Sequence, residues 1–213
     1  VNVSLDRVGI DEEGCRPNDH FLAADNAISL LQEQGIRVGI NCVISRHNYD
    51  GLDELIRYAR KRRIVDIEFL RFKPSGRGKE IYHEMKLLPE QVEDLYPKLK
   101  GLARKHRVSL KLDCSFTPFI CFHKPPKKYL EYFAIMGCVA GNWLIGLNAS
   151  GMSSPCSFIE THDIPIEQLA QNWAADKTFR DFRKWEEGGQ PICRDCDYLS
   201  LCKGGCHAVS SYV

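Results

Sequence analysis

The chain has 213 residues, of which 44% are hydrophobic and 27% charged, and its formal net charge is +1. This composition is typical of a globular protein with one large domain or two modest ones. Basic and acidic residues nearly balance, which argues against a nucleic-acid partner. No apolar run reaches the roughly 20 residues that a membrane helix needs, and no signal peptide opens the chain. We therefore expect a cytoplasmic protein with no membrane partner.

Residues 1–72 alternate between strand-like and helix-like patterns. Strands are predicted over 1–6, 36–44 and 64–72. One helix is predicted from Asn18 or Asp19 to a stop at Gly35, and a second from Leu52 to the basic residues 60–63. Strands that alternate with helices pair in parallel through right-handed crossovers. The fold class is therefore α/β. Because Val1 already lies inside a predicted strand, we expect sequence upstream of it.

The predicted strands have polar residues on one face. In the first strand Asn2 and Ser4 alternate with apolar residues, and Asn41 and Glu68 occupy later strands. A closed barrel usually has branched apolar residues on its inner face. The polar face therefore indicates an open pocket, although a sheet edge exposed by truncation would give the same pattern.

The pattern becomes less regular after residue 72. The Gly-rich run 74–79 lacks the spacing of a phosphate-binding loop and is predicted to be a turn. A helix is predicted from Pro89, a strand over 108–112, and a loop with one short helix over 113–137. A hairpin over 142–148 and 152–158 and an amphipathic helix over 178–187 follow. The remainder consists of turns and cysteines.

Ten cysteines are the most informative feature, and six of them lie after residue 137. These six are Cys138, Cys156, Cys193, Cys196, Cys202 and Cys206. The Cys-x2-Cys-x5-Cys-x3-Cys run is too closely spaced for a usual zinc ribbon. Closely spaced thiolates in loop-rich backbone favour iron–sulfur ligation, with zinc or disulfides as alternatives. Cys42 is expected in the core, and Cys15 has no assigned role.

Six thiols are too many for one four-thiolate site and too few for two. Either an upstream cysteine, Cys114 or Cys121, completes the ligands, or a ligand lies beyond Val213. The sequence does not choose between these sources.

These residues resemble a radical S-adenosylmethionine (SAM) enzyme with a SPASM domain. The run 138–156 has the family's Cys and Gly-then-Cys elements, and the run 193–206 has its four-cysteine group. Residues 1–77 are similar to the fourth to sixth strands of a radical SAM barrel. The likeness is in particular to enzymes of PQQ-type cofactor and peptide maturation.

The resemblance implies a fold and its boundaries. Residues 1–112 would be the second half of a partial (β/α)6 TIM-like barrel, residues 113–137 a linker, and residues 138–213 an incomplete SPASM domain. By resemblance, Ser4, Arg16, Asn41 and the Leu70 backbone would contact SAM, with the Arg16 guanidinium pairing with its carboxylate.

The resemblance also implies two auxiliary [4Fe–4S] clusters. One would be held by Cys138, Cys156 and Cys206, and the other by Cys193, Cys196 and Cys202. The family's Cys-x3-Cys-x2-Cys loop for a third, SAM-binding cluster is absent, as are its Gly-Gly-Glu segment and seventh cysteine. Asp6 is followed by Arg7 rather than the family's usual Gly. We therefore expect part of a longer enzyme that could not cleave SAM by itself.

The expected reaction of the parent enzyme is modification of a peptide or protein side chain by a 5′-deoxyadenosyl radical. The substrate could be a ribosomal precursor peptide, and the reductant a flavodoxin or ferredoxin. No general base can be singled out from the sequence. A non-catalytic electron-transfer or binding module, stabilised by iron–sulfur clusters or zinc, is the alternative.

Overall fold

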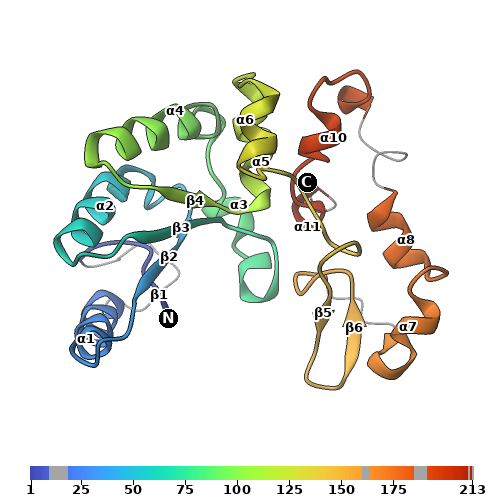
Figure 1. The fold of residues 1–213 in the computed structure, drawn as a ribbon, viewed down its shortest axis with the longest axis horizontal. Helices are drawn as coiled ribbons and strands as arrows, with labels where there is room; N and C mark the ends of the chain where they lie inside the picture. The colour runs from blue at the N-terminus through green and yellow to red at the C-terminus, as the bar shows by residue number, and fades with distance from the viewer. Residues whose placement is uncertain (10–18, 160–163, 185–190, 211, 213) are drawn as a thin grey trace. The chain divides into compact units, whose positions relative to one another are not determined.

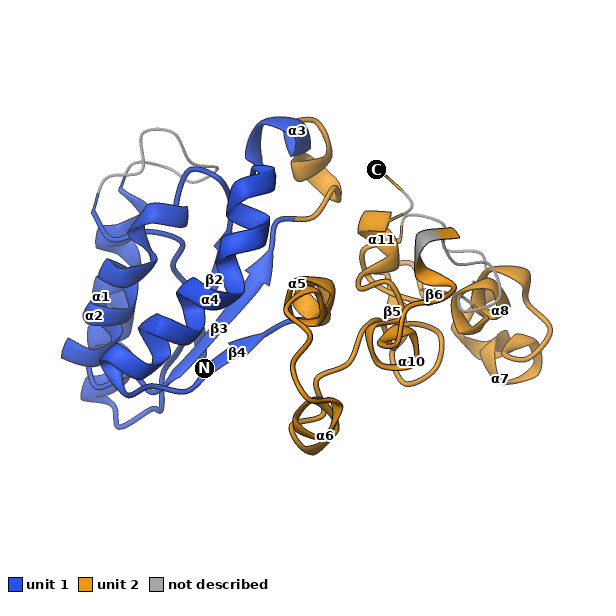
Figure 2. Ribbon diagram, turned by 90° about the horizontal axis from the view of Figure 1, so that it is seen from above, with its two compact units in different colours: residues 1–72, 81–113 blue, residues 73–80, 114–213 orange. Residues whose placement is uncertain are grey.

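The computed structural model describes residues 1–9, 19–159, 164–184, 191–210 and 212. They form two compact units (Figure 2). Unit 1 comprises residues 1–72 and 81–113, and unit 2 comprises residues 73–80 and 114–213. Cys15 and Arg16 lie outside the described residues. None of the helices in the described ranges is long and apolar enough to cross a membrane.

Unit 1 is built on a four-stranded parallel sheet in the order β1-β2-β3-β4 (Figure 1). The strands are β1 (Asn2–Ser4), β2 (Gly39–Ile44), β3 (Asp66–Arg71) and β4 (Leu110–Leu112). Parallel strands joined in sequential order by right-handed crossovers place their connecting helices on one face of the sheet. The predicted mixed α/β fold is confirmed, and the strands are shorter than predicted.

The helices of unit 1 form where the apolar spacing predicts them. They are α1 (His20–Glu33), η1 (Tyr49–Gly51), α2 (Leu52–Lys61), α3 (Tyr82–Met85) and α4 (Pro89–His106). Gly35, with φ +68°, follows the end of α1, and the Ile36 amide donates to the Leu31 carbonyl at 2.9 Å. This is the glycine stop that the sequence predicts.

The two faces of the sheet differ in chemistry. On one face Ile40, Cys42, Ile67 and Phe69 are fully buried, which confirms Cys42 as a core residue. The apolar stripes of the helices are also buried; they include Ala24, Ile28, Leu52, Leu55, Ile56, Ala59, Leu95 and Leu99. The opposite face carries polar side chains.

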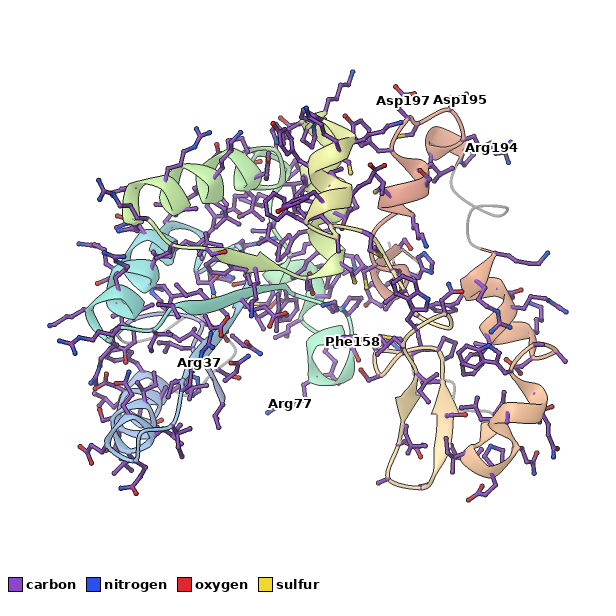
Figure 3. The ribbon with its side chains drawn as sticks, in the orientation of Figure 1. Arg37, Arg77, Phe158, Arg194, Asp195 and Asp197 are labelled. Atoms are coloured by element: carbon purple, nitrogen blue, oxygen red, sulfur yellow. The ribbon has the colours of Figure 1, made fainter. Side chains whose placement is uncertain are left out.

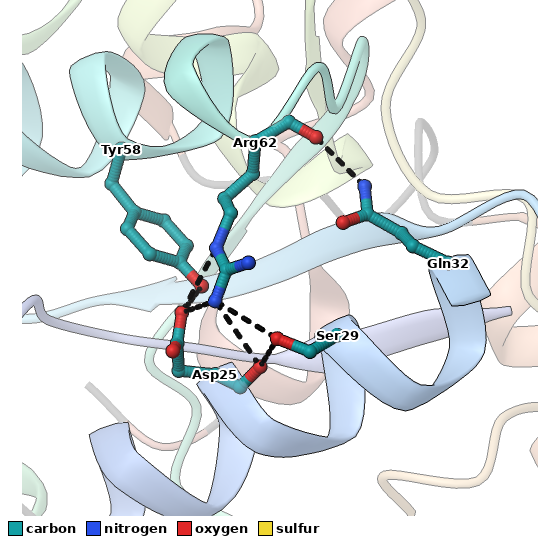
Figure 4. A network of polar contacts seen from close by, with 5 residues as sticks. All are labelled: Asp25, Ser29, Gln32, Tyr58 and Arg62. Carbon is teal, nitrogen blue, oxygen red and sulfur yellow. Dashed lines mark hydrogen bonds and ion pairs between the residues drawn. The ribbon is translucent and has the colours of Figure 1, made fainter.

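A polar network ties α1 to α2 (Figure 4). The Asp25 carboxylate accepts from Tyr58 Oη at 2.6 Å and from Arg62 Nε at 3.0 Å, and it forms an ion pair with Arg62. Arg62 also donates to Ser29 Oγ at 3.0 Å. Gln32 Nε2 donates to the Arg62 carbonyl at 2.7 Å. The guanidinium holds the pKa of Asp25 below its ordinary value.

Unit 2 consists of short elements. Its first part has η2 (Gly76–Lys79), η3 (Cys114–Phe116), α5 (Thr117–Phe122) and α6 (Lys127–Tyr132). A small antiparallel sheet contains β5 (Gly146–Leu147), β6 (Met152–Ser154) and β7 (Ile164–Pro165). The remaining elements are η4 (Ile166–Gln168), α7 (Leu169–Asn172), α8 (Lys177–Arg183), η5 (Pro191–Cys193), α10 (Leu199–Cys202) and α11 (His207–Ser210).

Two local predictions for unit 2 were wrong. The hairpin strands are shorter than predicted, because residues 139–143 form a turn in which the Trp143 amide donates to the Val139 carbonyl at 3.0 Å. Pro155 follows β6 and has no amide hydrogen to extend the ladder. Residues 113–137 contain two helices rather than one, since Pro118 suits the first turn of α5.

Candidate functional site

Cys138, Cys156 and Cys206, here called the Cys138 group, come together in unit 2. Cys138 and Cys156 belong to one buried cluster with Ala140, against which Ile159 and Phe182 pack. The Cys138 amide donates to the Gly205 carbonyl at 3.0 Å, which fixes Cys138 beside the residue that precedes Cys206. The three thiols come from a loop, the end of a hairpin and the start of a helix.

Burial sets the electrostatics of the Cys138 group. It raises the pKa of Cys138, while the amides of Ala140 and His207 donate to the Cys138 sulfur and oppose that rise. Burial likewise raises the pKa of Cys206, against the amide of Val209 and the charge of Lys73. Buried thiols of this kind are neutral by themselves, and a bound metal would hold them as thiolates.

Cys193, Cys196 and Cys202, here called the Cys202 group, lie on the run between η5 and α10. The Cys196 amide donates to the Cys193 carbonyl at 3.1 Å, so a single turn carries both thiols. The charges of Cys202 and Cys196 act on Cys193 and add to the effect of burial in raising its pKa. The three thiols are therefore electrostatic neighbours.

The backbone after Cys202 provides hydrogen-bond donors. Lys203, Gly204 and Gly205 have φ values of +50°, +70° and +78°, a conformation that glycine adopts without strain. A hydrogen bond from Cys121 lowers the pKa of Cys202, and the amides of Gly204 and Gly205 act in the same direction. Consecutive amides of this kind form a concave site that stabilises an anion such as a thiolate.

The turn that carries Cys196 is exposed. Arg194, Asp195 and Asp197 surround Cys196 in sequence, and all four residues are exposed (Figure 3). By contrast, each cysteine of the Cys138 group is buried. The two groups therefore differ in their access to solvent.

Gly137 connects the two groups through the backbone. Its amide donates to the Leu201 carbonyl at 2.7 Å, and a Cβ at this position would lie 1.8 Å from the Cys202 carbonyl oxygen. Only glycine permits this close approach without a shift of the backbone. The residue before Cys138 thus touches the last residue of α10.

The donor set fits an iron–sulfur cluster better than a single ion. None of the cysteines in the described ranges forms a disulfide. Within those ranges no three His, Cys, Asp or Glu side chains converge as a single metal ion would require. The thiolates of a [4Fe–4S] cluster bind different irons, so their sulfurs surround a volume and need not meet at one point. Neighbouring thiols in amide-rich loops satisfy that requirement.

Three of the four predicted SAM contacts lie on the polar face of the unit 1 sheet. Ser4, exposed at the end of β1, pairs in register with Asn41 of β2, and Asn41 pairs with Glu68 of β3. Leu70 follows Glu68 by two residues and so occupies the same face. Asn41 Oδ1 accepts from Asn2 Nδ2 at 2.9 Å. Arg16 is outside the described residues, and the SAM contacts stay a prediction.

Lys73 is a neighbour of the Cys138 group that the sequence did not reveal. Its charge acts on Cys206, and its Nζ lies 4.7 Å from the centre of the Phe158 ring. Lys73 and Cys206 are 133 residues apart, and no local spacing connects them. The structure alone brings this cation into unit 2.

Curated proteins similar to this chain include enzymes of peptide maturation. The mycofactocin maturase MftC of Mycolicibacterium smegmatis is 27% identical over 233 residues, which cover 100% of this chain and 54% of that protein. The PqqA peptide cyclase of Ruegeria pomeroyi is 27% identical over 231 residues, covering 96% of this chain and 56% of the relative. The chain thus spans about half the length of the curated relatives that it matches. No protein-family model matches it.

Solved structures show the same fold. Streptococcus suis SuiB bound to S-adenosylmethionine has a TM-score of 0.63 and 19% identity, over 97% of this chain and 50% of SuiB. SuiB bound to its precursor peptide SuiA has a TM-score of 0.62 and 16% identity, over 97% of this chain and 49% of SuiB. These likenesses confirm the predicted resemblance to radical SAM proteins of peptide maturation. The chain is therefore a homologue of the mycofactocin maturases and of PqqA peptide cyclase, with the fold of SuiB.

Proposed function

We propose that this chain belongs to a radical SAM enzyme that modifies a side chain of a peptide or protein. The observation that carries the proposal is the gathering of six cysteines into two neighbouring groups, joined at Gly137. This arrangement occurs in a chain that matches peptide-maturation relatives along its whole length. Unit 1 would be the second half of the partial barrel, and residues 138–213 a SPASM-type domain.

The residues of unit 2 would hold two auxiliary [4Fe–4S] clusters. The Cys138 group would hold one and the Cys202 group the other, with the amides of Ala140, Gly204 and Gly205 donating to the sulfurs. Iron–sulfur clusters supply or accept single electrons when they are bound. The burial of the Cys138 group and the exposure of Cys196 would give the two sites different potentials, because solvent access tunes a cluster.

The polar face of unit 1 would bind SAM. Asn2, Ser4, Asn41 and Glu68 supply hydrogen-bonding groups to this face, which an ordinary barrel core would fill with apolar side chains. Arg16 would pair with the carboxylate of SAM, since a guanidinium matches a carboxylate through two hydrogen bonds. A relative with this fold has been solved with S-adenosylmethionine bound.

A peptide is the substrate class that the relatives favour. One of them is a PqqA peptide cyclase, and SuiB has been solved with the precursor peptide SuiA. We therefore extend the proposal to a ribosomally made precursor peptide as substrate and to a flavodoxin or ferredoxin as reductant. Cytoplasmic location belongs to the same proposal.

The test is the metal content of the natural protein that contains this chain, purified without oxygen. We expect iron and sulfide in nearly equal amounts, with the broad visible absorption of thiolate-bound iron. Cys138→Ala and Cys202→Ala should each remove the cluster of one group, whereas Cys42→Ala, in the core of unit 1, should leave the iron content unchanged. A colourless protein that contains zinc and no iron would refute the proposal.

A further inference from the structure

Cys121 is a buried thiol that the two predicted sets of ligands leave out. It lies in α5, and its residue is 7% exposed. Four thiolates are usual for a [4Fe–4S] cluster, and the Cys202 group supplies three. Cys121 is therefore one of the candidates for the fourth.

The structure fixes α5 in a defined position within unit 2. Thr117 Oγ1 donates to the Met136 carbonyl at 2.9 Å, so the first turn of α5 is tied to the segment that leads into Cys138. A Cβ on Gly205 would lie 2.5 Å from Pro118 Cγ, which shows how closely the Gly-rich link after Cys202 approaches the same turn. Cys121 follows one turn later. Its placement beside α10 is thus held from two directions.

The thiol of Cys121 points at the Cys202 group. It donates a hydrogen bond to the sulfur of Cys202, and the charges of both Cys202 and Cys196 act on it. Tyr198, at the start of α10, donates from Oη to the Pro125 carbonyl at 2.7 Å, which ties α10 to the residues that follow α5. Cys121 is therefore brought to two of the three sulfurs of the group.

We infer that Cys121 is the fourth thiolate ligand of the cluster held by Cys193, Cys196 and Cys202. The inference rests on the proposed function, because it assigns a ligand to one of the proposed clusters. It completes that site from a helix 72 residues before Cys193 in the chain. The Cys138 group would then be the site that needs a ligand from elsewhere.

The test compares Cys121→Ser with Cys114→Ser and Cys42→Ala in the natural protein, all purified without oxygen. Cys121→Ser should lose about half of the iron and sulfide, or convert one cluster to a three-iron form, while the spectrum of the other cluster is retained. Cys42→Ala should bind as much iron as the wild type. Far-ultraviolet circular dichroism and the melting temperature of each variant show whether it has folded.

Each outcome has one interpretation. A wild-type protein that binds no iron refutes the proposed function, and the question of its ligands then disappears. A wild type with two clusters and an unchanged Cys121→Ser variant refutes the assignment of Cys121 alone. Loss of a cluster in Cys114→Ser but not in Cys121→Ser assigns the ligand to Cys114. Loss of both clusters in a folded Cys121→Ser variant also contradicts the inference, because a ligand of one site should not empty the other.

A second measurement separates a ligand from a packing residue. In a double variant with Cys138→Ala, the protein should contain only the cluster of the Cys202 group, and its electron paramagnetic resonance signal then reports that site alone. Cys121→Ser added to this background should change the line shape or abolish the signal. Phe119→Leu, at a buried residue of the same helix, should leave it unchanged.

Discussion

The two units of this chain achieve their structure by different means. Unit 1 has long helices whose apolar stripes cover one face of a parallel sheet, together with polar ties between helices. Unit 2 has helices of at most seven residues in its described part, strands of two or three, and most of the cysteines. Isolated helices and sheets of this size are marginal in water. The difference indicates that unit 1 is stabilised by its core, whereas unit 2 depends on metal ligation.

The largest expected effect is that of removing the metal. Because metal binding to a small site contributes free energy of folding, unit 2 should lose protection when iron is chelated, while unit 1 keeps its fold. We expect cleavage by a protease within 114–213 to become at least about 10-fold faster, with little change in 1–72. Peptide mapping by mass spectrometry measures both at once. Equal protection of the two units without iron would remove the proposed contrast.

Gly137→Ala should have the second largest effect. The added Cβ would overlap the Cys202 carbonyl oxygen, so the backbone must shift and both cysteine groups are disturbed. We expect a loss of about 1–3 kcal/mol in the stability of unit 2 and a lower iron content. The control is Gly101→Ala on α4, where a Cβ would meet no atom within 4 Å. An unaffected Gly137→Ala variant would show that this contact is not needed.

Asp25→Asn should weaken unit 1 and leave unit 2 unchanged. The variant removes the charge that holds Arg62 and Tyr58, at a cost of about 1 kcal/mol in the stability of unit 1. Urea unfolding measures the effect. The matched control is Asp181→Asn, which removes an exposed ion pair with Lys177 in α8 and should change stability little. A similar loss in both variants would contradict a specific role of the α1–α2 network.

The same network predicts a dependence on pH. The hydrogen bond from Arg62 lowers the pKa of Asp25 from its ordinary 3.8, so the carboxylate stabilises unit 1 above that pH. This contribution is lost as the pH falls through the lowered pKa of the folded state. Asp25→Asn should therefore destabilise unit 1 at neutral pH and have a smaller effect in acid. An effect of equal size at both ends of the titration would contradict this assignment.

The smallest expected effect is a gain. Gly101→Ala replaces an exposed glycine in the middle of α4, where alanine is preferred by roughly 0.5–1 kcal/mol. The melting temperature of unit 1 should rise slightly, with no change in iron content. A loss of stability would mean that Gly101 makes a contact other than the ones seen here.

The sequence was informative where the pattern is local. The stripe of α2, the glycine stop after α1 and the place of Cys42 in the core all follow from periodicity and turn chemistry. The elements of unit 2 were harder, because two- to four-residue pieces have no period to detect. α10 and α11 formed unpredicted on either side of the left-handed Lys203–Gly205 link.

Spacing within the cysteine run indicated a metal site, but not which distant residues join it. Cys121 and Lys73 approach the two cysteine groups only through the tertiary fold. The sequence left Cys114, Cys121 and a later ligand as equal candidates, since chain distance says nothing about their separation in space. The approach of Gly137 to Cys202 was equally hidden, although a glycine next to a cysteine was visible from the start.

The Lys203–Gly205 link also has a consequence for electron flow. Cys202 and Cys206 are four residues apart, so their Cα atoms can never be more than about 14 Å from each other, even in a fully extended chain. With one cluster on each cysteine, the link would act as a fixed spacer for tunnelling between two redox centres. Its left-handed residues shorten that spacer further. An inserted residue would lengthen the spacer and slow the exchange of electrons while leaving every ligand in place.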